Sequence, residues 1–270
     1  MNRNNIYDYD QIRELHSKGL TDKEISELIG AKPNAFAKVR KRLGLEPNKP
    51  RETYELKGKE LEILVGTLLG DSCVRYVHKK CKYPSLTFTH CMKQEEWFLW
   101  KYKNLNQLLS SYNVYDKTNY WTGDDKKEIQ CVGKNMKCLV EIRDIFYKEG
   151  IKIIPIDFLK ENFTELSLFC LYMDDGSYDK SSNSYIINTQ CFSGEDLEKF
   201  TNLLKEKFNL SFNIKKDHTL YLKHESNEIF KNILIKFNEC NTMDYKIECR
   251  LKTPLNEVKP EMVDHRTKPL

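Results

Sequence analysis

Residues 64–72, LVGTLLGDS, form an apolar run that ends with an aspartate followed by a serine. The stretch LFCLYMDDG at residues 168–176 repeats this pattern about 100 residues later. Each stretch predicts a buried helix that carries an acidic side chain at its C-terminal end. Because the pattern occurs twice, we interpret this part of the chain as two copies of one structural unit.

The segments that follow the two stretches also correspond to each other. Both copies predict, in order, a strand, an amphipathic helix, a second strand-like segment and a closing helix. In the first copy these lie at residues 85–91, 95–109, around 119–132 and 137–147. In the second copy they lie at residues 184–192, 194–208, 212–223 and 226–237. The order α-β-β-α-β-β-α, twice over, predicts an α+β fold with two pseudo-symmetric halves. We place the halves at residues 58–155 and 156–256, followed by a C-terminal tail at 257–270.

The N-terminal segment is predicted to form a separate three-helix domain. Thr21 and Glu24 have the spacing of a capping box at the start of the second helix, and Pro33 favours the first turn of the third. A short turn before a basic third helix resembles a helix-turn-helix DNA-binding module. That resemblance implies DNA contacts by Asn34, Lys38, Arg40, Lys41 and Arg42. The alternative is a small packing domain with a solvated basic face. We place this domain at residues 1–46 and a linker at 47–57.

The charge distribution indicates a phosphate-binding surface. The net charge is only +4, but residues 72–94 contain no acidic side chain. Five basic residues lie in that stretch with aromatic residues between them, namely Arg75, Lys79, Lys80, Lys82 and Lys93. Basic and aromatic side chains in one segment are typical of a nucleic-acid interface, although a charged run is more often a solvated face.

Composition also argues against several classes of protein. The longest apolar runs are far shorter than the ~20 residues of a membrane helix, and the N-terminus has no apolar signal-peptide core. The nine cysteines include no CxxC pair, so we expect buried free thiols rather than disulfides or zinc sites. No glycine-rich nucleotide loop is present. We expect an intracellular monomer, cytoplasmic and nucleoid-associated, with no membrane partner and no small-molecule cofactor.

The two motif stretches, with the elements after them, resemble the LAGLIDADG homing endonucleases of the single-chain, two-motif type. The resemblance covers about 200 residues. It implies curved antiparallel DNA-binding sheets and two motif helices packed side by side, with small residues at the contact. Gly66, Gly70 and Cys170 supply these. It further implies that Asp71 and Asp175 meet at the end of that contact and hold Mg²⁺ (or Mn²⁺), because hard cations prefer carboxylate oxygens.

The resemblance implies roles for further residues. Lys152 and Lys246 fall where the family has an active-site lysine in each half, and an ammonium there would stabilise charge on the phosphate. Gln190 and His90 are expected to occupy equivalent positions in the two halves and to order water in the active site. His90 could alternatively transfer a proton or contact DNA. Asp174 is expected to point elsewhere. Ser72 replaces the glycine that readily takes the left-handed conformation after a helix, so the first motif helix is expected to end with more difficulty.

Sequence readout is expected from strand side chains that alternate between the core and the major groove. The candidates, in addition to those of the N-terminal domain, are Arg75, Tyr76, His78, Lys80, Lys82, Thr87, Thr89, Trp121, Lys126, Gln130, Ser181, Asn183, Tyr185, Lys215, Lys216, His218 and Lys223.

The sequence therefore predicts a site-specific double-stranded DNA endonuclease that hydrolyses phosphodiester bonds with divalent metal at a long, asymmetric target. Two alternatives stay open. One is a catalytically inactive DNA-binding regulator of the same fold, and the other is an intron RNA maturase.

Overall fold

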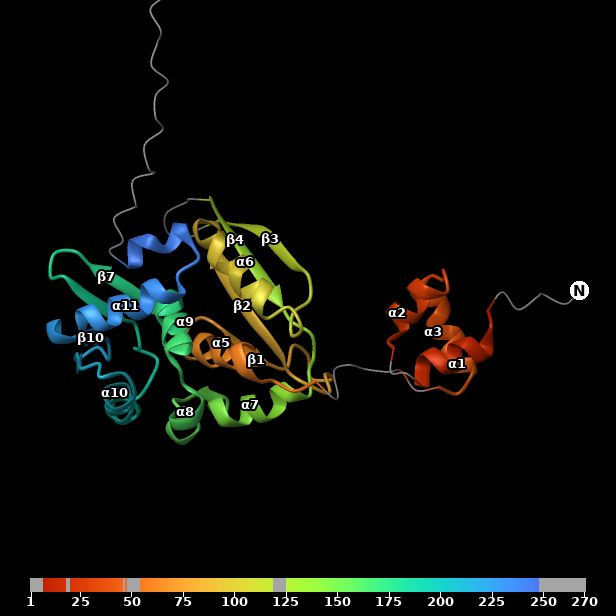
Figure 1. Cartoon of the computed structure of the whole chain (residues 1–270), viewed down its shortest axis with the longest axis horizontal. Coiled ribbons are helices and arrows are strands. Elements are labelled where there is room, and N and C mark those ends of the chain that lie inside the picture. Colours follow the sequence, from red (N-terminus) through yellow and green to blue (C-terminus); the bar gives the residue numbers. More distant parts are fainter. Residues whose placement is uncertain (1–6, 18–19, 46, 48–53, 119–124, 248–270) are drawn as a thin grey trace, which may run out of the picture.

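The computed structural model describes residues 7–17, 20–45, 47, 54–118 and 125–247 (Figure 1). Most of the expected linker, the 257–270 tail and Trp121 lie outside these residues. Among the described residues, no helix is both long and apolar enough to cross a membrane. The eight cysteines in this part are free thiols, and two of them, Cys91 and Cys191, are exposed rather than buried.

Three short helices form the N-terminal unit: α1 (Tyr9–Ser17), α2 (Asp22–Leu28) and α3 (Pro33–Arg42). They bury a small core of Ile12, Ile25, Phe36 and Val39, which shares no residue with the larger core. The capping box is confirmed, since Thr21 Oγ1 accepts from the backbone N–H of Glu24 and the Glu24 carboxylate accepts from that of Thr21.

The first half consists of α5 (Gly58–Leu69), β1 (Cys73–Arg75), β2 (Ser85–Cys91), η1 (Met92–Gln94), α6 (Glu95–Asn104), β3 (Tyr112–Thr118), β4 (Asp125–Val132), α7 (Cys138–Phe146), β5 (Tyr147–Lys148) and β6 (Ile151–Lys152). The second consists of α8 (Ile156–Asn162), α9 (Glu165–Asp175), β7 (Gly176–Asp179), β8 (Ser184–Ile187), α10 (Gly194–Phe208), β9 (Phe212–Ile214), β10 (Leu220–Leu222), η2 (His224–Ser226), α11 (Asn227–Phe237) and η3 (Asn241–Lys246). The order predicted from sequence is confirmed.

Both halves have the same sheet topology. The strands are antiparallel in the orders β1-β2-β4-β3 and β7-β8-β10-β9, which correspond strand for strand. One continuous hydrophobic core runs through both halves. At its centre the motif helices α5 and α9 pack side by side between the two sheets (Figure 1). This arrangement brings the C-terminal ends of the two motif helices close together.

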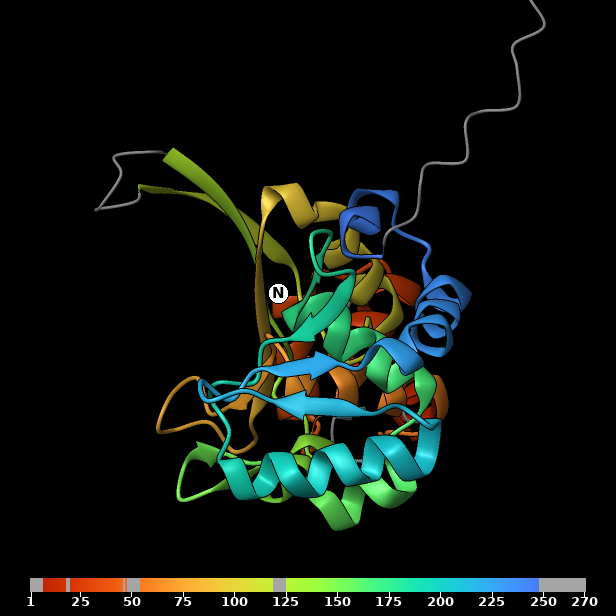
Figure 2. The same ribbon diagram turned by 90° about the vertical axis from the view of Figure 1, so that its left-hand side faces the viewer.

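Two strand predictions differ from the structure. The hairpin of β3 and β4 begins at Tyr112 rather than near residue 119, and it extends beyond the other strands of its sheet (Figure 2). Residues 111–117 are all exposed, including Tyr112, Val114 and Tyr115, so β3 does not bury one face as the alternation of a half-buried strand would predict. In the second half, β8 ends at Ile187 rather than at residue 192, because Thr189–Phe192 forms a turn before α10.

Small residues permit the close approach of α5 and α9. A Cβ on Gly66 would lie 2.1 Å from the carbonyl oxygen of Ser167 and 2.8 Å from Cys170 Cβ, and one on Gly70 would lie 2.6 Å from Asp174 Cβ. These distances are far below van der Waals contact. The expected small-residue contact is therefore present, with Gly66 on α5 facing Cys170 and Gly70, directly after α5, facing Asp174.

The first motif helix does end differently from the second, at Leu69, two residues before its aspartate, but the left-handed conformation expected after the motif aspartate was the wrong reason. Gly176 has φ −85° and so does not use the left-handed region; a Cβ there would instead lie 2.3 Å from the Tyr172 carbonyl oxygen. Ser72 is buried, with its Oγ 2.7 Å from Thr67 Oγ1 and its N–H donating to the Thr67 carbonyl. The glycine of the second motif is needed for space, and the first motif has room for a hydrogen-bonded serine.

Gly66→Ala is expected to destabilise the protein by about 3 kcal/mol or more, because the added methyl overlaps a backbone oxygen that moves only if the helices separate. Gly194→Ala is the matched control, since a Cβ there meets only His218 Nε2 at 3.7 Å, and its effect should stay within about 0.5 kcal/mol. Urea unfolding followed by circular dichroism measures both. Equal stability of the two variants would show that α5 and α9 do not pack as closely as described.

Candidate active site

The two motif aspartates lie at the C-terminal ends of the packed helices. Asp175 is the last residue of α9, whereas α5 ends at Leu69, two residues before Asp71. Burial and the charge of Asp174 raise the pKa of Asp71. Burial together with the charges of Asp71 and Asp174 raises the pKa of Asp175 to about 7. Each carboxylate is thus in a place that disfavours its own negative charge, which a bound cation would relieve.

Both expected lysines lie beside these aspartates. Lys152 Nζ donates to the carbonyl oxygens of Gly70 and Ser72, each at 2.9 Å. Lys246 Nζ donates to those of Met173 and Asp174, at 2.7 and 3.0 Å. Each ammonium therefore binds carbonyl groups where a motif helix ends, a position that favours positive charge. Burial lowers the pKa of both lysines, while the charge of Asp175 opposes this effect at each.

Asp174 is the centre of a buried network that the sequence did not reveal. Its Oδ1 accepts from Lys101 Nζ and Trp97 Nε1, both at 2.7 Å, and its Oδ2 accepts from Thr67 Oγ1 at 2.5 Å. Burial alone would raise the pKa of Asp174, but the charge of Lys101, the His90 ring and hydrogen bonds from Lys101 and Thr67 together outweigh burial, and the pKa is lowered. Asp174 is therefore a buried, ionised carboxylate close to the two motif aspartates, and it pairs with Lys101 of the first half.

One signal in the sequence could have indicated this network. Asp174 occupies the motif position of Gly70 in the first copy, so a carboxylate at a close helix contact required a buried cationic partner. Trp97 and Lys101 are four residues apart on α6 and so share one face of that helix. The sequence alone did not distinguish Lys101 from the neighbouring Lys103.

His90 and Gln190 are not equivalent, contrary to the sequence alignment. Strand pairing gives the correct correspondence: Cys73, two residues after Asp71, pairs with Thr87, and Ser177, two residues after Asp175, pairs with Ile186. Three residues further along the chain in each half, His90 on β2 corresponds to Thr189 in the turn after β8. His90 is buried near the aspartates, and burial, aided by Lys101, lowers its pKa to about 3. Gln190 is exposed in the turn after β8, and its role stays a prediction.

The donor set fits a divalent cation. Asp71, His90 and Asp174 each offer a ligand atom, and these atoms lie within 4.8 Å of one another. Asp175 adds a third carboxylate, whose ionisation is electrostatically disfavoured by Asp71. Carboxylate oxygens next to a partly open surface are the ligands that Mg²⁺ and Mn²⁺ accept in proteins.

Comparison with known proteins agrees with this geometry. The model of the LAGLIDADG DNA endonuclease family matches residues 61–230. The chain belongs to this family. It is 26% identical over 212 residues to the probable intron-encoded endonuclease 1 of Wickerhamomyces canadensis, which covers 71% of this chain and 88% of that protein. An uncharacterized protein of Methanocaldococcus jannaschii is 26% identical over 226 residues, 74% of this chain and 79% of that protein.

A solved structure supports the same assignment. The homing endonuclease I-WcaI bound to its DNA recognition sequence has a TM-score of 0.65 and 25% identity, covering 77% of this chain and 96% of that chain. The resemblance inferred from the two motifs is thereby confirmed, as is the LAGLIDADG fold. The helix-turn-helix interpretation of the N-terminal unit stays a prediction.

Most side chains that this LAGLIDADG protein was expected to direct at DNA are exposed. These are Asn34, Lys38, Lys41, Arg42, Arg75, Tyr76, His78, Lys80, Lys82, Ser181, Asn183, Lys215, Lys216 and Lys223. Thr89 and Gln130 are partly buried and joined by a 2.8 Å hydrogen bond across β2 and β4. The His218 ring is partly buried and donates from Nδ1 to the Phe192 carbonyl oxygen. DNA contact by any of these residues stays a prediction.

Three expected DNA contacts conflict with the structure. Arg40 donates from Nε to the Asp22 carboxylate at 2.8 Å and from a terminal nitrogen to the Leu45 carbonyl, so it holds α2 and α3 together. Thr87 is 4% exposed, buried on β2. Tyr185 is 1% exposed and packs against Tyr172 and Phe230 in the core. Trp121 and the side chain of Lys126 lie outside the described part.

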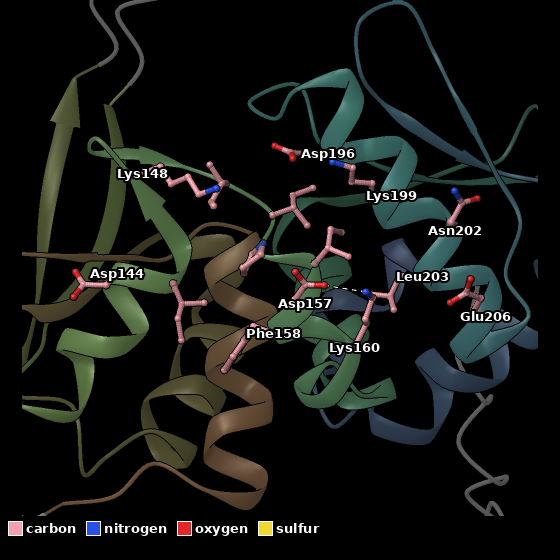
Figure 3. A pocket seen from close by; sticks show the side chains of 15 residues that line it. Asp144, Lys148, Asp157, Phe158, Lys160, Asp196, Lys199, Asn202, Leu203 and Glu206 are labelled. Atoms are coloured by element: carbon pink, nitrogen blue, oxygen red, sulfur yellow. Dashed lines mark hydrogen bonds and ion pairs between the residues drawn. The ribbon is translucent and has the colours of Figure 1, made fainter.

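A surface cleft of this LAGLIDADG protein lies apart from the candidate active site. It runs between α7, α8 and α10, and neither the motif aspartates nor Lys152 and Lys246 line it (Figure 3). Its charged lining mixes both signs, with Asp157 paired to Lys160 at 2.9 Å. The acidic side chains there would repel phosphate groups, so we do not assign the cleft to a DNA surface.

Proposed function

We propose that this LAGLIDADG protein is a homing-type endonuclease that cuts double-stranded DNA at a long asymmetric site with Mg²⁺ or Mn²⁺. The observation that carries the proposal is the placement of Asp71 and Asp175 at the ends of two packed helices, where burial and neighbouring carboxylates raise the pKa of both. Intron mobility is part of the same proposal, because one similar protein is a probable intron-encoded endonuclease.

Asp71 and Asp175 would hold the cations. A divalent cation held there would supply Lewis-acid chemistry, which would lower the pKa of a water and stabilise negative charge on the phosphate. Lys152 and Lys246 each use two of three ammonium donors on backbone carbonyls, so one N–H of each stays available for a phosphate oxygen. Buried ammonium groups stabilise developing negative charge more strongly than exposed ones.

A cleavage assay tests this function. The full chain is incubated with a tiled library of duplex DNA, including DNA from its own locus, in Mg²⁺, in Mn²⁺ and in EDTA. We expect cleavage at one long site in either metal and none in EDTA. Binding with no strand scission in any metal would favour the inactive regulator, for which the earlier end of α5 beside Asp71 is the specific structural argument.

We propose that residues 1–46 add affinity and footprint length but no chemistry. Lys38, Lys41 and Arg42 are exposed on α3, and α1–α3 have a core of their own. A chain that begins at Arg51 should bind at least about tenfold more weakly at moderate salt, since fewer phosphates are neutralised, yet cut normally at saturating protein. Filter binding and single-turnover cleavage measure the two effects. A well-folded shortened chain that binds but has lost turnover would refute this division.

A further inference from the structure

The ring of His90 has a buried nitrogen without a partner. Its side chain is 1% exposed, and Nε2 has no hydrogen-bond partner among the described protein atoms. Nδ1 lies 3.2 Å from Oε1 of Gln94, whose amide nitrogen donates to the Tyr245 hydroxyl. Because Oε1 is an acceptor, Nδ1 carries the ring proton and Nε2 presents a lone pair.

That lone pair faces another acceptor. Nε2 of His90 lies 3.8 Å from Oδ1 of Asp174, a carboxylate that Lys101 keeps ionised. Two acceptors that face each other in the interior leave both incompletely satisfied, unless a cation or a water lies between them. The carboxylate can take a further ligand, because two oxygens accept about four bonds and Lys101, Trp97 and Thr67 supply three.

Asp71 connects this position to the solvent. The ligand atoms of Asp71, His90 and Asp174 lie within 4.8 Å of one another, and Oδ2 of Asp71 also lies 3.7 Å from the protonated Nδ1 of the His90 ring. The side chain of Asp71 is 38% exposed, whereas the other two are buried. The group thus has two oxygen ligands, one nitrogen ligand and an open side through which an ion can enter.

We propose that Asp71, His90 and Asp174 form a cation site with an imidazole ligand, which prefers a transition cation such as Mn²⁺ to Mg²⁺. Imidazole suits first-row transition cations, whereas Mg²⁺ prefers oxygen ligands alone. The second half has no such site among its described residues, because Thr189 replaces His90 and its hydroxyl donates to the His218 carbonyl. The two halves therefore differ in metal preference at the end of the helix contact. This inference rests on the proposed function only in taking Asp71 as a metal ligand.

Metal binding to the full chain without DNA tests the proposal. After EDTA treatment and dialysis, Mn²⁺ is added and studied by electron paramagnetic resonance, where a directly bound imidazole gives a nitrogen coupling in the spin-echo modulation. We expect this coupling in the wild-type protein. His90→Gln should abolish it and weaken Mn²⁺ binding at least about tenfold while changing Mg²⁺ binding less than about threefold, as expected for loss of a nitrogen ligand.

His224→Gln is the matched control, because His224 is an exposed histidine of η2 that belongs to none of the candidate sites and should leave the signal and the Mn²⁺ affinity unchanged. Wild-type Mn²⁺ without nitrogen coupling, or unchanged Mn²⁺ affinity in folded His90→Gln, would overturn the proposal and leave a water in the position. If His90→Gln fails to fold, the wild-type coupling decides alone. DNA cleavage in Mg²⁺ without the coupling would refute this inference but not the nuclease, whereas coupling without cleavage in either metal would refute only the nuclease.

Discussion

Asp175→Asn is expected to abolish DNA cleavage and to leave DNA binding intact. The amide keeps the size of the carboxylate but removes a charged oxygen ligand at the point where the two motif helices end. Loss of one group that stabilises charge in the transition state costs about 10²–10³-fold in rate, and loss of a metal ligand should cost at least as much. Single-turnover cleavage at saturating protein measures the rate, and fluorescence anisotropy in EDTA measures binding.

The control for this variant is Asp157→Asn. Asp157 is exposed on α8 and pairs with Lys160 away from the helix contact, so its loss should leave the cleavage rate within about twofold, as for surface substitutions in general. Asp175→Asn at wild-type speed would remove Asp175 from the chemistry. Equal loss of cleavage in both variants would point to a general effect of the lost charge.

The raised pKa of Asp175 also predicts how this variant behaves without metal. Because the pKa in the folded protein is about 7 and thus above that of an unfolded aspartate, ionisation lowers the stability of the wild-type protein as pH rises through 7. The asparagine side chain of the variant cannot ionise. Metal-free Asp175→Asn should therefore be at least as stable as wild type at pH 8, and should lose this advantage below about pH 4. Thermal unfolding in EDTA at both pH values measures it and also shows that the variant folds.

The sequence was sufficient to predict the parts of the site that follow helical periodicity. The two apolar stretches and their terminal aspartates predicted which helices meet, and Gly66 and Gly70 predicted how closely they do so. Lys152 and Lys246 came from the family resemblance, and the structure places both at the carbonyls that end the motif helices. Nothing in the spacing of these lysines along the chain would have indicated that position.

Strand register and helix rotation account for what the sequence did not predict. A shift of one residue along a strand exchanges the faces of a sheet, which is why His90 was aligned with Gln190 instead of Thr189. Asp174 and Asp175 are adjacent but project about 100° apart on a helix with 3.6 residues per turn. Only packing determines that Asp174 points at Lys101 while Asp175 lies at the helix end. Tyr185 belongs to the core for the same reason.

Lys101→Met is expected to destabilise the protein by about 3–5 kcal/mol, because it leaves the fully buried carboxylate of Asp174 without its cation. Methionine fills the volume of the lysine stem, so the loss reports the uncompensated charge rather than a cavity. Without Lys101, burial would raise the pKa of Asp174, and the deficit should shrink at pH 5, where protonation becomes easier.

The matched variant is the double substitution Lys101→Met with Asp174→Asn. It removes both charges, so it should recover most of the lost stability, as buried ion pairs contribute little net stability compared with neutral groups of similar shape. Urea unfolding of wild type, both single variants and the double variant completes the cycle, with a coupling energy of at least about 2 kcal/mol expected for residues in direct contact. Additive single effects would mean that Lys101 and Asp174 do not interact. The Lys101–Asp174 ion pair would then not distinguish the surroundings of Asp71 from those of Asp175. The earlier end of α5 would be the remaining structural difference between the two motif aspartates.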